Sequence, residues 1–495
     1  MRPTLVFEGH TLAPEQFDER CLRSAAALQA AGVQEGDVVA LFMHNSPFNL
    51  ELMMATRHLG AQWCPVNWHY KADEVRYILA NSGAKVLVAD APLLDALRGL
   101  DLTGVKVWCT RGTKSLAEAP SWEATRDATA PIATPPAAPR GAMFYTSGTT
   151  GRPKGIVRHP MTPAQVAANA TMRRSAYGVQ PGMRALLNAP LYHSAPNSYA
   201  LGLIQESATL FIEERFDAER TLALIAEHRL THAYLVPTMY VRLLALPAAV
   251  RAKYDISSMR FVASTGSPCP PEVKRAMIDW WGPVIHECYG ASELGYMTLL
   301  TSEQALRKPG SAGQPLPGVA LKILDDAGRE LPPNAPGLIY INQPATPDFS
   351  YIGNAEARER MEVAGLKTMG DIGYVDEEGF LFIVDRQADM VISGGVNIYP
   401  AEIENLLQTM PGVADCAVFG IPDDEFGEAL AAAVQATPGH MLAADAVRAW
   451  LRERLAGFKV PKIVTLHEQL PREDTGKIFK RKLREPYWAG RSRQV

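Results

Sequence analysis

The strongest constraint on the fold is an alternation of two hydrophobic periods along the first hundred residues. Apolar residues recur every three or four positions over residues 14–30, which predicts an amphipathic helix. The apolar run 38–43 follows, then a second helix capped by Ser46, and then further short runs that flank a third helix. Strands that alternate with helices are typical of a mostly parallel sheet covered by helices. The sequence therefore predicts an α/β fold.

The chain has 495 residues, more than a single hydrophobic core usually supports. Four prolines within residues 131–139 predict an extended connection, because proline fits neither a helix interior nor a central strand. The alternation resumes after this connection, and the character of the chain changes near Asp385. We predict a large N-terminal domain of mixed and parallel sheets covered by helices, residues 1–385, and a small α+β C-terminal domain, residues 386–495.

The C-terminal domain carries its own pattern. Pro400 opens a predicted helix, the runs 416–421 and 429–435 predict strands, and Asp445 is the predicted cap of a further helix. A basic run at residues 480–484 is typical of a solvated face or a weak anion site.

Charge and cysteine usage exclude several classes of protein. Lys and Arg total 49 against 53 Asp and Glu, a formal charge of −4, and no basic tract indicates binding to nucleic acid or to a membrane surface. The six cysteines form no C-x-x-C pair, and their scatter fits a reducing compartment. We found no signal-peptide core and no apolar run near the ~18 residues of a spanning helix. These features predict a soluble cytoplasmic protein without an integral membrane segment, and they leave a homodimer open.

The most informative segment is Tyr145-Thr-Ser-Gly-Thr-Thr-Gly-Arg-Pro-Lys-Gly155, which follows an extended stretch. Its glycines let the backbone approach a ligand and point N–H groups at it, and Lys154 adds a charge suited to a polyphosphate. The composition predicts a phosphate-binding loop, with a polar surface loop as the alternative. The segment is not a phosphate loop of the kinase type, because glycine follows Lys154, and no G-x-G-x-x-G occurs in the chain.

This segment resembles the signature loop of the adenylate-forming superfamily, which includes acyl-CoA and aryl-CoA synthetases, peptide-synthetase adenylation domains and beetle luciferases. Further motifs follow in the order of that family and span nearly the whole chain: Pro190-Leu-Tyr-His-Ser194, Tyr289-Gly-Ala-Ser-Glu-Leu-Gly295, Thr368-Met-Gly-Asp371, Asp385-Arg-Gln-Ala-Asp389, Gly394-Gly-Val-Asn-Ile-Tyr-Pro400 and Pro471-Arg-Glu-Asp-Thr-Gly-Lys477.

The resemblance implies an AMP-forming acid–CoA ligase that uses ATP, Mg²⁺ and CoA. A carboxylate would attack the α-phosphorus of ATP to give an acyl-adenylate and pyrophosphate, and a thiol would then displace AMP. The expected acid is hydrophobic: aromatic and hydroxycinnamate-like, or a medium- to long-chain fatty or bulky alicyclic acid. Two alternatives stay open, an adenylation enzyme that loads the phosphopantetheine of a carrier protein and a non-catalytic nucleotide-binding regulatory protein.

The resemblance also assigns nucleotide ligands. The pyrophosphate end of ATP would contact the signature loop: Thr146, Ser147, Gly148, Thr149, Thr150, Gly151 and Lys154. Glu293, with Thr146, would bind Mg²⁺. The remaining AMP ligands would be Ser292 at the α-phosphate, Asp371 at the ribose and Arg386 at ribose or phosphate. Tyr289 would stack on adenine, the turn of Gly266, Ser267 and Pro268 would line the adenine and acyl sites, and Gly290 would also contact the nucleotide.

Three catalytic residues are implied: Lys477 for adenylation, Glu293 for the metal, and His193 as a gate that shields the acyl-adenylate. The expected acyl pocket comprises Tyr192, His193, Asn197, Ser264, Gly290, Ala291, Leu294 and Met297. Gly394, Gly395 and Val396 would face the CoA thiol. The resemblance further implies that the small domain is mobile between the two half-reactions. Ala388 stands where many relatives carry a charged hinge residue, so no charged hinge is assigned.

Overall fold

The chain folds into two compact units in a computed structural model that describes residues 3–97, 99–112, 119–146, 153–387, 389–393, 396–472 and 478–489. The first unit comprises Met1–Pro309, Gly313–Ala320 and Asn342–Glu362, and the second comprises Gly310–Ala312, Leu321–Ile341 and Val363–Val495. Residues 363–385 thus pack within the second unit. The functional boundary at residue 385 stays a prediction.

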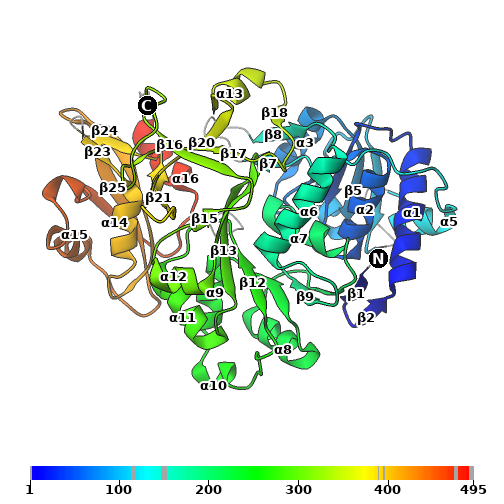
Figure 1. Cartoon of the computed structure of the whole chain (residues 1–495), viewed down its shortest axis with the longest axis horizontal. Helices are drawn as coiled ribbons and strands as arrows, with labels where there is room; N and C mark the ends of the chain where they lie inside the picture. The colour runs from blue at the N-terminus through cyan, green and yellow to red at the C-terminus, as the bar shows by residue number, and fades with distance from the viewer. Residues whose placement is uncertain are drawn as a thin grey trace. The chain divides into compact units, whose positions relative to one another are not determined.

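A nine-stranded mixed sheet forms the centre of the first unit (Figure 1), with the order β15-β14-β13-β12-β11-β9-β10-β1-β2. Its strands are β1 (Thr4–Phe7), β2 (His10–Leu12), β9 (Arg184–Leu187), β10 (Thr209–Ile212), β11 (His232–Tyr234), β12 (Phe261–Ser264), β13 (Ile285–Ala291), β14 (Gly295–Leu300) and β15 (Gln314–Pro315). Neighbouring strands are parallel in the run β1-β10-β9-β11-β12-β13. The pairs β1-β2, β13-β14 and β14-β15 are antiparallel. The predicted α/β class is confirmed.

Helices connect the parallel strands of this sheet from β9 to β13, as an α/β fold requires. They are α7 (Ser194–Leu203), α8 (Ala218–His228), α9 (Pro237–Leu244), α10 (Ala248–Arg251) and α11 (Pro271–Trp281), while α6 (Pro163–Tyr177) precedes β9 and α12 (Ser302–Arg307) lies between the antiparallel strands β14 and β15. Tyr177 and Tyr199 from α6 and α7 pack edge to face with ring centroids 5.3 Å apart, and both rings are buried.

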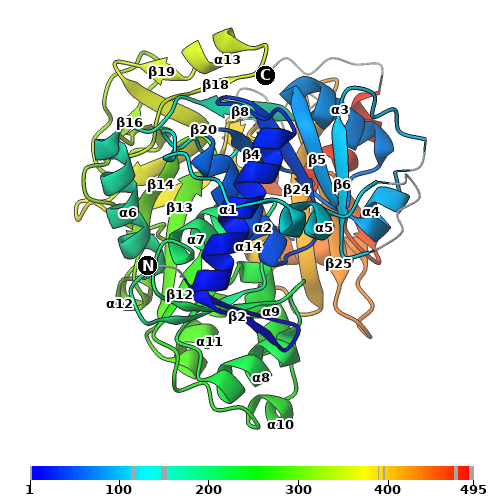
Figure 2. The same ribbon diagram turned by 90° about the vertical axis from the view of Figure 1, so that its right-hand side faces the viewer.

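A second, parallel sheet has the order β4-β3-β5-β6 and confirms the predicted alternation at the N-terminus. Its elements are α1 (Pro14–Ala30), β3 (Val38–Phe42), α2 (Pro47–His58), β4 (Gln62–Pro65), α3 (Ala72–Ser82), β5 (Ala84–Asp90), α4 (Ala91–Asp95), β6 (Lys106–Thr110) and α5 (Trp122–Ala128). Ser46 is the N-cap of α2, as predicted. Helix α1 packs against α2 and α5 (Figure 2).

A small antiparallel sheet, β18-β8-β7, carries the ends of the signature loop. It consists of β7 (Tyr145–Thr146), β8 (Lys154–Arg158) and β18 (Phe349–Tyr351), and α13 (Ala355–Glu359) follows β18. Thr146 pairs with Lys154 across β7 and β8, and Tyr351 pairs with Ile156 across β18 and β8. The sheet therefore brings residues some 200 positions apart in sequence next to one another.

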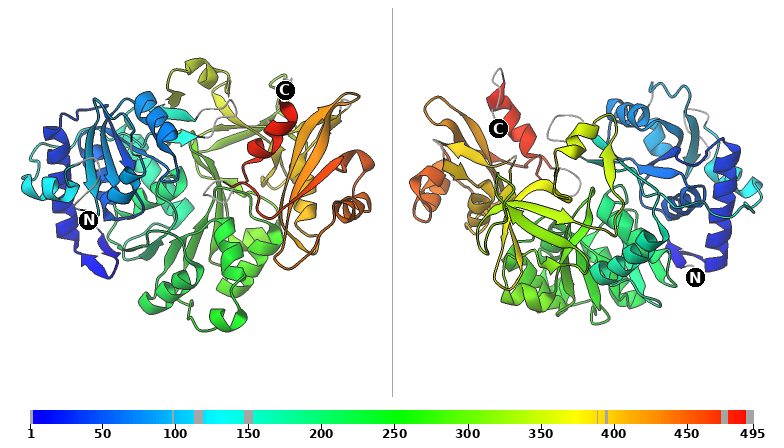
Figure 3. Two further views of the ribbon diagram at one scale, coloured as in Figure 1. Left: turned by 180° about the vertical axis from the view of Figure 1, so that it is seen from behind. Right: turned by 45° about the horizontal axis from the view of Figure 1, so that its top comes forward.

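The second unit contains two sheets. The first consists of β16 (Ala320–Leu324), β17 (Gly337–Asn342), β19 (Glu362–Val363), β20 (Leu366–Val375) and β21 (Leu381–Arg386). The second consists of β22 (Val391–Ser393), β23 (Val396–Ile398), β24 (Val413–Asp423), β25 (Gly427–Ala436) and β26 (Ile463–His467), with α14 (Pro400–Leu407), α15 (Ala444–Arg452), the 3₁₀ turn Gly457–Lys459 and α16 (Lys480–Trp488) (Figure 3).

Both faces of this second sheet are covered, because successive side chains of β24 point to opposite faces and pack in two different clusters. Cys416 and Val418 pack with residues of α14 and α15, whereas Phe419 and Ile421 pack with Leu483 and other residues of α16. The predicted cap of α15 is wrong. Ala443 is the N-cap, and Asp445 lies inside the first turn, where a carboxylate still favours the positive end of the helix dipole.

Within the described part of the chain, no helix is both long and apolar enough to cross a membrane. All six cysteines are buried with free thiols.

Candidate active site

The predicted nucleotide and acid motifs of the first unit gather at one edge of the nine-stranded sheet. The segment 190–194 follows β9, the segment 264–268 begins at the last residue of β12, and the segment 289–293 spans the end of β13. These three strands run parallel, so their carboxyl ends meet at the same edge, where ligands bind in open α/β sheets.

Glu293 is the centre of a buried polar cluster beside this edge. Its side chain is 5% exposed, and its Oε1 accepts a hydrogen bond of 3.0 Å from the Tyr351 hydroxyl and one of 3.4 Å from Thr146 Oγ1. The structure thus brings together the two predicted metal ligands. Tyr351 comes from β18, far away in sequence, and the sequence analysis missed it.

Lys154 joins the same cluster through the ring of Tyr351. Its Nζ lies 5.3 Å from the ring centroid, within the range of a cation–π contact. Burial and the neighbouring carboxylate of Glu293 raise the pKa of Tyr351 well above its ordinary value, so its hydroxyl stays a hydrogen-bond donor. Thr146 and Lys154, at the two ends of the signature loop, therefore lie beside the hydroxyl of Tyr351 and the carboxylate of Glu293.

Arg158 is a second residue that the sequence analysis missed. Its guanidinium donates to the carbonyl oxygens of Ser292, Glu293 (2.7 Å) and Pro347 (3.0 Å). Burial lowers the pKa of Arg158 to about 10, which still leaves it charged at neutral pH. Because it holds the backbone on both sides of the site, Arg158 fixes the position from which Glu293 projects.

The histidine motif stands at the start of α7, where His193 is the N-cap residue. Its ring centroid lies 4.3 Å from that of Tyr192, which packs edge to face on Trp68 at 4.5 Å. Ser194 Oγ and Ser292 Oγ are hydrogen bonded at 2.7 Å, which links this motif to the predicted α-phosphate ligand. Trp68 was not predicted.

Backbone geometry explains two of the glycines. A Cβ on Gly290 would lie 2.6 Å from the carbonyl oxygen of Gly295, closer than any side chain allows. Gly266 has a φ of +101°, which side chains disfavour. Tyr289 lies next to Gly290 at an irregularity in the pairing of β13 with β14. Ser267 and Pro268 follow Gly266 in the same turn.

The expected acyl-pocket residues are mostly buried at the same edge. Ser264, Leu294 and Met297 are buried, and Gly290 and Ala291 are partly buried. The amide of Asn197 accepts from Trp63 Nε1 at 3.2 Å and donates to the Leu191 carbonyl at 2.9 Å, so it is committed to holding α7 in place. The acyl pocket stays a prediction.

Asp371 and Arg386 lie in the second unit and face each other across β20 and β21. Arg386 Nε donates to Asp371 Oδ1 at 3.2 Å, and Asp371 is 6% exposed. The two predicted ribose ligands are therefore held side by side by strand register. Val396 is exposed on β23. The predicted residues Ser147, Gly148, Thr149, Thr150, Gly151, Ala388, Gly394, Gly395 and Lys477 lie outside the described residues.

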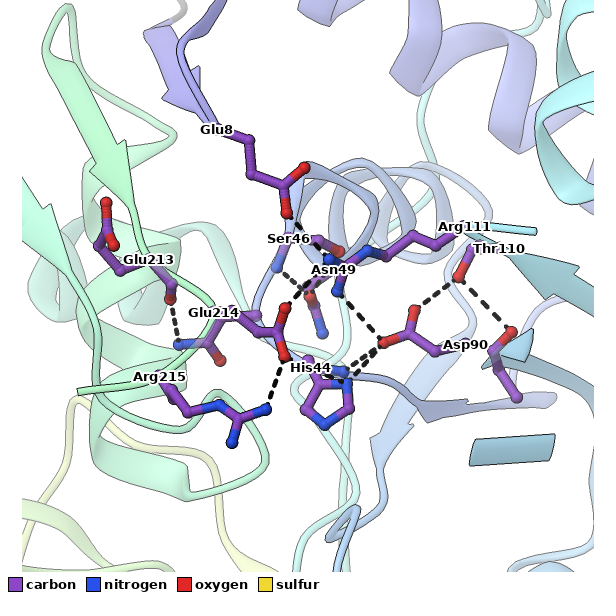
Figure 4. A network of polar contacts seen from close by, with 12 residues as sticks. Glu8, His44, Ser46, Asn49, Asp90, Thr110, Arg111, Glu213, Glu214 and Arg215 are labelled. Atoms are coloured by element: carbon purple, nitrogen blue, oxygen red, sulfur yellow. Dashed lines mark hydrogen bonds and ion pairs between the residues drawn. The ribbon is translucent and has the colours of Figure 1, made fainter. Parts of the chain in front are cut away.

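A polar network that the sequence analysis missed joins the two large sheets of the first unit at their carboxyl ends (Figure 4). Asp90 at the end of β5 accepts from the backbone N–H of His44 and contacts its Nδ1, both at 2.9 Å. Arg111 after β6 pairs with Glu214 after β10 at 3.0 Å and with Glu8 after β1 at 2.9 Å. The ring of His44 lies 5.0 Å from that of Trp68, so the network reaches the aromatic contacts of His193.

Known proteins match this chain along nearly its whole length. The profile of the AMP-binding enzyme family matches residues 1–347, and that of the AMP-binding enzyme C-terminal domain matches residues 402–477. A feruloyl-CoA synthase from an Amycolatopsis species is 34% identical over 97% of this chain and 94% of its own length. A fatty acid–[acyl-carrier-protein] ligase from Streptomyces coeruleorubidus is 33% identical over 100% and 95%. A long-chain-fatty-acid–CoA ligase from Mycobacterium tuberculosis is 35% identical over 96% and 93%.

The fold agrees with these matches. The crystal structure of ATP-bound MatB from Rhodopseudomonas palustris superposes with a TM-score of 0.87 at 30% identity, over 98% of this chain and 96% of that one. The chain therefore belongs to the AMP-binding enzyme family of the adenylate-forming superfamily, and it is an AMP-forming acid–thiol ligase.

Proposed function

We propose that this ligase activates a hydrophobic carboxylic acid with ATP and transfers the acyl group to CoA, using the residues gathered around Glu293. A carboxylate oxygen attacks the α-phosphorus and pyrophosphate leaves, which gives the acyl-adenylate. The sulfur of CoA then attacks the acyl carbon and AMP leaves. The cluster of Thr146, Lys154, Tyr351 and Glu293 supports this proposal, because neutral donors, a cation and one carboxylate side by side suit the binding of a polyphosphate with its Mg²⁺.

The phosphate ligands have separate tasks in this proposal. Lys154 neutralises the pyrophosphate end and Ser292 donates to the α-phosphate, while Arg158 keeps the backbone of residues 292 and 293 in place. The carboxylate of Asp371 accepts from the ribose hydroxyls, and Arg386 stands beside it.

The donor set near Glu293 fits Mg²⁺. Within the described residues no group of three His, Cys, Asp or Glu could hold a metal alone. Mg²⁺ is commonly held by one or two carboxylates together with phosphate oxygens and waters, and Glu293 with the hydroxyl of Thr146 supplies that protein share. When bound, the metal would neutralise phosphate charge. Tyr351 contributes by orienting the carboxylate of Glu293.

Lys477 supplies the cation for the adenylation step, and His193 covers the acyl-adenylate until the thiol arrives. A change of pose of the C-terminal domain between the half-reactions stays a prediction, as does the role of residues 394–396 at the CoA thiol. A homodimer and a cytoplasmic location also stay predictions.

The relatives support only a class of acid, a hydrophobic carboxylic acid, and we propose no individual acid. Feruloyl and long-chain fatty acyl groups are both hydrophobic, and the buried apolar residues Leu294 and Met297 at the predicted pocket suit such a group. One relative is a fatty acid–[acyl-carrier-protein] ligase, which supports a carrier protein as a second candidate acceptor of the acyl group. We therefore keep a carrier-protein phosphopantetheine as the alternative to free CoA.

One experiment tests both the class of the acid and the identity of the acyl acceptor. Purified enzyme receives ATP and Mg²⁺ with a panel of aromatic, fatty and alicyclic acids, and AMP release is measured with free CoA and, separately, with a phosphopantetheinylated carrier protein. Faster turnover with CoA supports the first candidate, and faster turnover with the carrier supports the second. Absence of acid-dependent AMP release with either acceptor contradicts both candidates.

A further inference from the structure

Lys480 is unlike the rest of the basic run to which it belongs. The sequence predicts a solvated face or a weak anion site for residues 480–484, yet the Lys480 side chain is only 21% exposed and its Nζ pairs with Glu404 Oε1 at 2.8 Å. Burial by itself would lower the pKa of Lys480, but the carboxylates of Glu404, Asp389 and Asp385 raise it well above its ordinary value. Lys480 is therefore a permanent cation inside an acidic cluster, and the prediction of a solvated face is wrong for this residue.

The acidic cluster belongs to the parts of the second unit that lie next to the nucleotide ligands. Asp385 accepts from the backbone N–H of Arg386 at 2.7 Å and from that of Ala401, in the first turn of α14, at 2.9 Å. Glu404, one turn further along α14, also accepts from the backbone N–H of Val418 on β24 at 2.6 Å. Lys480 therefore ties the start of α16 to α14, and the first turn of α14 is in turn bonded to Asp385 on the strand that carries Arg386.

A second set of contacts holds the chain on the other side of residues 473–477. Arg472 and Ile478 form an antiparallel bridge, and Phe479 donates its backbone N–H to the Pro471 carbonyl at 2.8 Å. The guanidinium of Arg472 pairs with Asp415 on β24. The described residues before and after this five-residue segment are thus anchored to the same sheet.

We infer that Lys480 is a positioning residue for the adenylation step, which fixes the chain beside Lys477 to the strand that bears Arg386. The inference rests on the proposed role of Lys477, three residues away. A catalytic cation must be held to within about 1 Å of its productive place, and a long side chain on an unanchored segment does not meet that demand. Asp371, Arg386 and Lys480 all lie in the second unit, and the ion pair holds the described start of α16 against α14, whose first turn is hydrogen bonded to the carboxylate next to Arg386.

The main test is the double variant Lys480→Met with Glu404→Gln. Methionine keeps the length of the side chain without its charge. Glutamine still accepts from the N–H of Val418, and the pair of changes removes both members of the ion pair, while Asp385 keeps its backbone donors at Arg386 and Ala401. Lys480→Arg is the conservative rescue. Lys462→Gln is the matched control, because it removes the ion pair that the exposed Lys462 makes with Asp423 at 2.7 Å in the same unit.

Each variant is assayed in two half-reactions, adenylation by acid-dependent ATP–pyrophosphate exchange and transfer from supplied acyl-adenylate to CoA. We expect the double variant to lose about 10- to 100-fold in adenylation and to keep transfer within about twofold. Lys480→Arg should recover most of the adenylation rate, and the Lys462 control should match the wild type. Unchanged adenylation, or an equal loss of both half-reactions, would overturn the positioning role.

Lys477→Ala, assayed in parallel, separates this inference from the function on which it rests. If Lys477→Ala loses adenylation and the double variant does not, only the inference about Lys480 fails. If Lys477→Ala retains adenylation, the proposed role of Lys477 fails as well, and the positioning role is overturned with it.

Discussion

The hydroxyl of Tyr351 donates a hydrogen bond of 3.0 Å to Oε1 of Glu293, although the two residues are 58 positions apart. The ring of the same tyrosine lies 5.3 Å from the ammonium of Lys154. One side chain thus orients the proposed metal ligand and contacts the proposed phosphate ligand. We therefore expect Tyr351 to contribute to ATP use.

Tyr351→Phe should lower the adenylation rate about tenfold, because a hydrogen bond to a charged group is worth about 1.5–3 kcal/mol. The loss should be partly recovered at high Mg²⁺, since the change disturbs the orientation of Glu293 and leaves its charge. Pyrophosphate exchange measured against Mg²⁺ concentration checks this. Tyr374→Phe, which alters a ring stacked on Phe382 in the second unit, is the control. A wild-type Mg²⁺ response in Tyr351→Phe would refute the orienting role.

Glu293→Gln should raise the Mg²⁺ concentration needed for half-maximal adenylation by about tenfold or more, because an amide oxygen is a weaker ligand than a carboxylate for a hard cation. The fold should survive, since the amide oxygen can still accept from Tyr351 and Thr146. Thermal unfolding and a Mg²⁺ titration are measured together. An unchanged metal requirement at wild-type stability counts against the metal role.

Asp371→Ala should raise the KM for ATP by about tenfold or more, because the ribose loses a charged acceptor. The KM for the acid should change much less. Steady-state kinetics with each substrate varied in turn give the comparison. Asp325→Asn, a change in an exposed turn of the same unit, is the control. Equal rises in both KM values would remove the specific assignment to the ribose.

The first unit should lose stability as the pH falls below neutral. Burial lowers the pKa of His232 and of His286 from 6.5 to about 4, and Phe261 stacks between the two rings. The unfolded chain therefore binds protons at these sites before the folded chain does, so stability falls between pH 6.5 and pH 4.

Each of these histidines should contribute about 2 kcal/mol to this loss at pH 4.5. Unfolding in urea at several pH values measures it, and His232→Gln should flatten the pH dependence while His440→Gln, in an exposed turn, leaves it unchanged. An identical pH slope in His232→Gln and wild type would contradict this explanation.

Glu51 and Arg126 form a buried ion pair at 2.7 Å, with side chains 0% and 4% exposed. Glu51→Ala leaves Arg126 buried without this partner, so it should reduce the free energy of unfolding by about 3 kcal/mol. Arg76→Ala breaks an exposed pair with Asp73 and should change stability little. Denaturant unfolding compares the two, and similar effects would show that burial does not decide the outcome.

Local patterns in the sequence predicted most of the fold. Ser46 and the spacing of residues 14–30 gave the correct helices because capping and amphipathic periodicity act within one element. The prediction of Asp445 as the N-cap of α15 was wrong, because a carboxylate is favourable both at the N-cap and in the first turn of a helix. Only the backbone conformation distinguishes these two positions.

The candidate site was predictable where a motif is continuous. Thr146 and Glu293 were identified and do meet in the structure. Tyr351, Arg158 and Trp68 could not be identified, because their importance depends on strand pairing between distant segments, and a lone tyrosine, arginine or tryptophan has no local signal. Lys480 was misread for the same reason, since the acids around it come from other elements.

The most direct test of the central claim is a single assay with the purified chain, ATP, Mg²⁺, CoA and a panel of hydrophobic acids, read out as AMP and acyl-CoA. The account predicts one AMP and one pyrophosphate for each acyl-CoA formed, and no AMP when the acid is omitted. Release of ADP in place of AMP, or AMP formation that is independent of any acid, would contradict it.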